Sequence, residues 1–85
     1  MIKLTIIYNT EKDSAIKIYN ELLNFLKSKS EFEIIDQADI SKADYVVVIG
    51  GDGTLLRGFR KIKNKKTKVV AINSGTLGYL TEIRK

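Results

Sequence analysis

The chain of 85 residues is 44% hydrophobic and has a formal charge of +5, which is typical of one small folded domain and excludes a disordered segment. It contains no cysteine and no histidine, which excludes a disulfide framework, a thiolate metal site and a histidine base; acid–base chemistry therefore falls to carboxylates, Lys or Tyr. No apolar run approaches the roughly 20 residues of a membrane span, so we expect a cytoplasmic protein without a membrane partner.

The first half of the chain predicts two strands separated by one amphipathic helix. Residues 3–8 are rich in Ile and predict a strand, and residues 32–35 predict a second, shorter one. Residues 14–29 predict the helix, because their apolar members follow helical spacing and form one buried stripe. The stripe consists of Ala15, Ile18, Tyr19, Leu22, Phe25 and Leu26. The polar segment 36–44 has room for one helical turn.

The second half predicts two further strands joined by a helix. Residues 45–49 are mostly β-branched and predict a strand covered on both faces, as in a parallel sheet, and residues 69–72 predict a fourth strand. Residues 55–62 predict a helix that turns four apolar side chains toward the sheet, namely Leu55, Leu56, Phe59 and Ile62. Alternating strands and helices predict an α/β fold with three layers: a mainly parallel, Rossmann- or flavodoxin-like sheet with helices on both faces.

Three loops follow the carboxyl ends of the predicted strands, at residues 9–10, 50–54 and 73–78, and we expect them to share the ligand-binding rim of the sheet. In the second loop, Gly50, Gly51 and Gly53 let the backbone turn and approach a ligand. The loop leads into a helix N-terminus, which favours phosphate. Asp52 is unusual there because a carboxylate repels phosphate unless it handles a metal ion or a proton. Its alternative role is to cap the helix.

Two common phosphate-binding patterns do not fit this loop. Gly53 and Gly58 have the spacing of the Walker pattern, but Phe59 follows where that pattern requires Lys. Gly51 and Gly53 begin the dinucleotide fingerprint, but Leu56 stands at its third glycine. The glycine loop is therefore neither a P-loop nor a dinucleotide fingerprint.

Basic residues gather within the segment 57–68, which contains Arg57, Arg60, Lys61, Lys63, Lys65, Lys66 and Lys68. One interpretation is a solvated helix end and turn, since cations suit a helix C-terminus. The other is a field that attracts a polyanion such as a nucleotide. No aromatic stacking platform or known DNA-binding motif accompanies these charges, so we expect no nucleic-acid partner.

Two motifs together resemble the NAD kinase family. Residues 50–54, Gly-Gly-Asp-Gly-Thr, resemble a signature that NAD kinases share with diacylglycerol-type lipid kinases and, more loosely, 6-phosphofructokinases. Residues 71–81, Ala-Ile-Asn-Ser-Gly-Thr-Leu-Gly-Tyr-Leu-Thr, are similar to the NAD kinase segment G-[IV]-N-x-G-x-L-G-F-L-T. Lipid kinases carry a Pro-x-Gly-Thr-Gly-Asn type of segment there, and this chain has no proline. Two departures are Ala71 for a frequent Gly and Tyr79 for the usual Phe.

The resemblance implies Mg²⁺-dependent transfer of a phosphoryl group from ATP or polyphosphate to the adenosine ribose 2′-OH of NAD, giving NADP, with the metal ion carried by the donor phosphates. It implies that Asp52 is catalytic, contacting the ribose hydroxyls and taking the proton of the attacking 2′-OH. It further implies nucleotide contacts from Gly51, Gly53, Leu56, Arg57, Asn73, Leu77, Gly78 and Tyr79. The alternative role of Asn73 is to brace its own loop through an Asx turn.

NAD kinases have two domains, and the resemblance assigns residues 1–85 to the first. The family's Asn-Glu motif, second glycine-rich segment and all-β C-terminal domain have no counterpart in these residues. We therefore expect part of a longer protein that is inactive alone and is a homo-oligomer at full length. The strand-like segment 79–83 is expected to leave an edge and an apolar face uncovered. A non-enzymatic, flavodoxin-like nucleotide-binding module and a fragment of a lipid or sugar kinase remain as alternatives.

Overall fold

The structure, a computed structural model, describes residues 1–73 and the backbone of residues 80–84. Within this part of the chain, five strands form one sheet in the order β2-β1-β3-β4-β5. The first four are parallel to one another, and β5 pairs with β4 in the antiparallel direction. The strands are β1 (Ile2–Tyr8), β2 (Phe32–Ile34), β3 (Tyr45–Gly50), β4 (Lys68–Asn73) and β5 (Leu80–Arg84). The predicted mainly parallel α/β sheet is confirmed.

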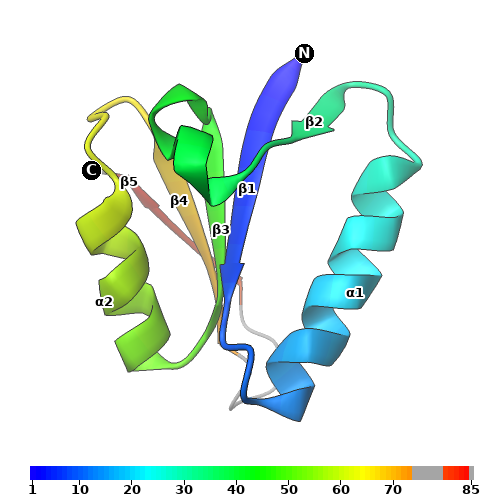
Figure 1. The fold of residues 1–85 in the computed structure, drawn as a ribbon, viewed down its shortest axis with the longest axis vertical. Coiled ribbons are helices and arrows are strands. Elements are labelled where there is room, and N and C mark those ends of the chain that lie inside the picture. Colours follow the sequence, from blue (N-terminus) through cyan, green and yellow to red (C-terminus); the bar gives the residue numbers. More distant parts are fainter. Residues whose placement is uncertain (74–79, 85) are drawn as a thin grey trace.

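Two α-helices cover opposite faces of the sheet (Figure 1). These are α1 (Asp13–Lys27) and α2 (Asp52–Lys61), and a short 3₁₀ helix, η1 (Gln37–Lys42), lies on the same side as α2. The single turn expected between residues 36 and 44 is this η1, which begins where the Asp36 carboxylate accepts a hydrogen bond from the Ala38 N–H at 3.2 Å. The three-layer arrangement is therefore confirmed.

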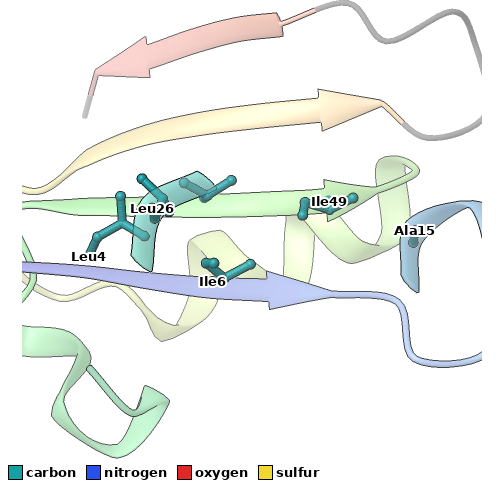
Figure 2. Packing of buried hydrophobic residues seen from close by; sticks show 6 residues of the cluster. Leu4, Ile6, Ala15, Leu26 and Ile49 are labelled. Atoms are coloured by element: carbon teal, nitrogen blue, oxygen red, sulfur yellow. The ribbon is translucent and has the colours of Figure 1, made fainter. Parts of the chain in front are cut away.

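Strand β3 is buried on both faces, as its β-branched run predicts. Val47 and Ile49 pack in the cluster under α1, which Figure 2 shows from close by, while Val46 and Val48 pack in the cluster under α2. None of the four is more than 5% exposed. Because burial of one such side chain is worth about 1.5–3 kcal/mol, this strand is the centre of the core.

Helix α1 buries most of its predicted stripe, but Phe25 was wrongly assigned to it. Ala15 and Leu26 are buried against β1 and β3, as Figure 2 shows. Phe25 is 57% exposed, and the Lys29 Nζ lies 5.4 Å from its ring centroid. Phe25 and Leu26 follow Leu22 by three and four residues, so both lie about one helical turn beyond it. Of the two, only Leu26 points at the sheet.

Helix α2 begins at Asp52, three residues before the predicted start. Leu55, Phe59 and Ile62 pack toward the sheet as predicted, but Leu56 does not. The most deeply buried positions recur every fourth residue, at Thr54, Gly58 and the C-cap Ile62. Leu56 is 54% exposed, so its predicted orientation toward the sheet was wrong. Leu56 precedes Gly58 by two residues and therefore lies about 200° from it around the helix, because successive residues turn by 100°. The bare Gly58 is the residue that faces β3.

The sheet is less well covered at the end of β4 than at its centre. Val70, Ala71 and Ile72 of β4 are half-buried. The strand-like segment predicted at 79–83 is confirmed as β5 from Leu80 onward. The structure describes only the backbone of this strand. In the described part of the chain, no helix combines the length and apolar character that crossing a bilayer requires.

Candidate nucleotide site at the carboxyl rim of the sheet

The sheet order reverses direction between β1 and β3. From β1 the chain moves outward to β2, and it then returns past β1 to β3 and continues to β4. In open parallel sheets, ligands bind outside the carboxyl ends of the strands at such a switch point. The loops that follow β1 and β3 meet there, because the Asn9 N–H donates to the Ile49 carbonyl at 3.1 Å. The predicted common rim is confirmed for these two loops.

Of the glycines in the rim loop, Gly50 is the one that the turn requires. Its φ is +156°, which side chains rarely adopt, and a Cβ placed there would lie 2.6 Å from Thr54 Oγ1. Gly51 is the extended N-cap of α2 with φ −99°, and Gly53 lies in the first helical turn. A Cβ at Gly51 or at Gly53 would meet nothing within 4 Å. The fold itself therefore gives no steric reason for glycine at these two positions, which present bare backbone to open space.

Asp52 is the first residue of α2 and is exposed to solvent. Gly51, and not Asp52, is the N-cap, and no side-chain capping bond forms at this helix start. Within the described residues, the Asp52 carboxylate has no hydrogen-bond or ion-pair partner. Its structural contribution is then a favourable charge at the positive end of the helix dipole, worth about 0.3–1 kcal/mol. Leu56 follows one turn later on the same face, so a ligand that contacts Asp52 also reaches this exposed side chain.

Two basic side chains of α2 line a cavity of about 330 Å³ beside this rim. Arg57 and Lys61 lie one turn apart on one face, and both are exposed. The Arg57 Nη2 donates to Thr54 Oγ1 at 3.4 Å, and the Lys61 Nζ donates to Gln37 Oε1 at 2.9 Å. Among the site residues predicted from the sequence, only Arg57 belongs to this cavity. The sequence signal that could have identified Lys61 is its four-residue spacing from Arg57, which places both side chains on one face of the helix.

Asn73 brings the start of the second motif beside the glycine loop. It is the last residue of β4 and is the register partner of Gly50, the last residue of β3. Its side chain is exposed. The other predicted contacts of the second motif, Leu77, Gly78 and Tyr79, lie outside the described residues.

The described residues do not converge on a metal ion. Among them, no three acidic side chains come together as a group that could hold one. Asp52 is a single carboxylate at the rim, which suits Mg²⁺ only where the ion also binds substrate phosphates. The described residues therefore suit a metal ion that binds together with substrate phosphates. They do not suit an ion that is held by protein ligands alone.

The described residues form a doubly wound α/β domain of the nucleotide-binding class, with glycine backbone and the exposed Asp52 carboxylate at the switch point. More specifically, the chain belongs to the family of ATP-NAD kinase N-terminal domains, whose family model matches residues 31–85. The matched region includes both motifs and every element from β2 to β5.

Individual relatives agree with this assignment. The NAD kinase of Fusobacterium nucleatum subsp. nucleatum is 74% identical over 85 residues, which cover all of this chain and 32% of that protein. The NAD kinase of Methanosphaera stadtmanae is 34% identical over 95% of this chain and 35% of its own length. The bifunctional NADP phosphatase/NAD kinase of Methanocaldococcus jannaschii is 31% identical over 99% of this chain and 16% of its own length.

The chain thus spans about a third or less of the length of these curated relatives. No solved structure matches it.

Proposed function

We propose that the chain is the N-terminal, nucleotide-contacting domain of an NAD kinase. The longer protein would transfer a phosphoryl group from ATP or polyphosphate to the adenosine ribose 2′-OH of NAD, giving NADP. Membership of the ATP-NAD kinase family and the length of the relatives support this proposal. A second, C-terminal domain would complete the site, so these 85 residues alone would be inactive. The full-length protein would work in the cytoplasm as a homo-oligomer.

The observation that carries the site assignment is an acid without a partner among the described residues, with bare backbone on either side. Asp52 is exposed at the helix N-terminus, and the open space beside Gly51 and Gly53 leaves room for a nucleotide to approach their amides. Neither feature is needed to pack the domain. We assign ribose and diphosphate contacts to these three residues.

Six further residues complete the acceptor side of the proposed site. Leu56 offers an apolar surface one turn from Asp52, and Arg57 offers a cation near the phosphates. Asn73 lies beside the glycine loop through its pairing with Gly50. Leu77, Gly78 and Tyr79 are assigned to the nucleotide on the motif alone, with the Tyr79 ring against a base.

In the proposed mechanism, Asp52 accepts the proton of the ribose 2′-OH as that oxygen attacks the terminal phosphorus of the donor. The bond from phosphorus to the leaving oxygen breaks, and the donor leaves shortened by one phosphoryl group. Mg²⁺ bound to the donor phosphates would neutralise their charge. The chain's own residues orient the acceptor, since phosphoryl transfer depends mainly on positioning and charge stabilisation.

Asp52→Asn in the full-length protein tests this assignment. A positioned general base contributes about 10²–10⁴-fold, so we expect kcat for NADP formation to fall by that factor. Asp13→Asn is a matched control, because Asp13 is likewise the first residue of its helix and is exposed. Both substitutions remove the same dipole interaction, so their effects on unfolding are expected to agree within about 1 kcal/mol. Full activity of Asp52→Asn would refute the base assignment.

A further inference from the structure

The turn between α2 and β4, residues 62–67, carries cations that the proposed nucleotide site does not use. Its lysines, Lys63, Lys65 and Lys66, are all exposed, and no residue of the segment 60–68 is acidic. The structure gives the three ammonium groups no ion pair and no hydrogen bond within the described residues. We refer to residues 62–67 as the basic turn.

The backbone of the basic turn is held in place against the end of η1. Asn64 forms an Asx turn, in which its Oδ1 accepts from the Lys66 N–H at 2.9 Å, and its Nδ2 donates to the Ser41 carbonyl at 3.2 Å. Thr67 is 2% exposed, and its hydroxyl donates to the Ala43 carbonyl at 3.0 Å. The lysines therefore extend from a fixed backbone, so a partner that binds them does not have to order the turn.

The helix dipole explains the cations of α2 but not those of the basic turn. Arg60 and Lys61 lie in the last turn of the helix, where a cation is favourable. The C-cap Ile62 has an extended backbone with ψ 113°, so the chain leaves the helix at this residue. The dipole interaction falls off within the last helical turn. The solvated helix end that the sequence suggested therefore covers only Arg60 and Lys61.

The basic turn lies at the opposite end of the sheet from the nucleotide rim, as Figure 1 shows. Helix α2 separates the turn from Asp52, and its 10 residues span about 15 Å. The Debye length at physiological ionic strength is about 8 Å, so the field of the turn is largely screened at Asp52. A nucleotide bound at the rim does not explain these lysines, which point to a second anionic partner.

The composition of the basic turn indicates the kind of partner. Its exposed residues, 63–66, are three lysines and one asparagine. Protein–protein interfaces are depleted of lysine and have an apolar core, whereas nucleic-acid interfaces are polar and strongly positive. The sequence lacks an aromatic platform and a known DNA-binding motif, but these serve contact with bases. Contact with the phosphate backbone requires neither.

We propose that the basic turn binds the phosphate backbone of double-stranded nucleic acid, independently of base sequence, with Lys63, Lys65 and Lys66 neutralising phosphates. Lys42 adds a fourth exposed cation beside the turn, because it follows Ser41, the residue that Asn64 contacts. A duplex fits better than a single strand, since single strands are held largely by stacking of bases on aromatic rings. This binding is separate from NADP formation and does not depend on it.

Titration of the full-length protein with a labelled duplex of about 20 base pairs, at several salt concentrations, tests the proposal. A plot of log binding constant against log salt concentration has a slope of about −0.9 per neutralised phosphate. Lys65→Gln/Lys66→Gln is therefore expected to reduce the magnitude of the slope by about 1–2 and to weaken binding at low salt at least about tenfold.

Lys12→Gln/Lys17→Gln is the matched control, because it removes the same charge from two exposed lysines at the start of α1, on the other face of the sheet. It should change the slope by less than about 0.5. Equal effects of the two double variants would mean a diffuse field and would overturn the proposal. Wild-type protein that binds no duplex at low salt would overturn it as well.

Two comparisons of anions separate the other possible partners. Double-stranded DNA and double-stranded RNA present the same phosphates, so both are expected to bind, and base sequence should change the affinity less than about threefold. Tighter binding of a single strand would refute the duplex, and tighter binding of poly-L-glutamate would identify an acidic protein segment instead. NADP formation by Lys65→Gln/Lys66→Gln should match the wild type, so a failure of this inference leaves the proposed function untouched.

Discussion

The side chain of Thr54 occupies the space that a Cβ of Gly50 would need. The ideal Cβ position at Gly50 lies 2.6 Å from Thr54 Oγ1 and 2.7 Å from its Cβ. Thr54 itself is 4% exposed and belongs to the buried face of α2. The glycine at the end of β3 and the threonine four residues later therefore form one packing unit, which sets how α2 leaves the strand.

Gly50→Ala is expected to destabilise the domain. The φ of +156° and the contact with Thr54 each add a cost, so we expect the free energy of unfolding to fall by at least about 2 kcal/mol in urea denaturation. Gly51→Ala is the control: its site is open and its φ is −99°, so the loss should not exceed about 1 kcal/mol. Equal losses for the two variants would contradict the packing unit.

Gly58→Ala is expected to reveal the close contact between α2 and β3. Alanine favours the helix by up to about 1 kcal/mol, but its Cβ would lie 2.9 Å from Val48 Cγ2, and overpacking costs about 1–3 kcal/mol. We therefore expect a net loss of stability. In a Val48→Ala background the clash disappears, so Gly58→Ala should become neutral or stabilising there. A double-mutant cycle without coupling would rule out the contact.

Leu56→Ser tests whether an exposed leucine serves the ligand. Because Leu56 is 54% exposed and lies outside both core clusters, we expect unfolding to change by less than about 0.5 kcal/mol. KM for NAD in the full-length protein should rise about five- to tenfold through lost apolar contact. Phe25→Ser on α1 is a control of similar exposure, 57%, and should leave KM unchanged. An unchanged KM for Leu56→Ser would remove this residue from the proposed site.

The correct sequence-based predictions were those that depend on local patterns. The β-branched run of β3 predicted a strand buried on both faces, and alternating elements predicted the parallel order that brings the loops after β1 and β3 together. The same reasoning failed where two apolar residues competed for one face, as with Phe25 and Leu26 on α1. Periodicity identifies a helix, but it fixes the direction of the buried face only within about one residue.

For this protein, the sequence by itself determined the element types, the α/β class, the position of the glycine loop at a strand end and the two family motifs. These features depend on residues close together in the chain. Only the tertiary structure decided that Leu56 faces solvent, that the turn requires Gly50 but not Gly51, and that Lys61 contacts Gln37 across 24 residues of sequence. The reason is that Gly58 faces Val48 at close approach, so the orientation of α2 follows from contact with the sheet and not from the helix pattern.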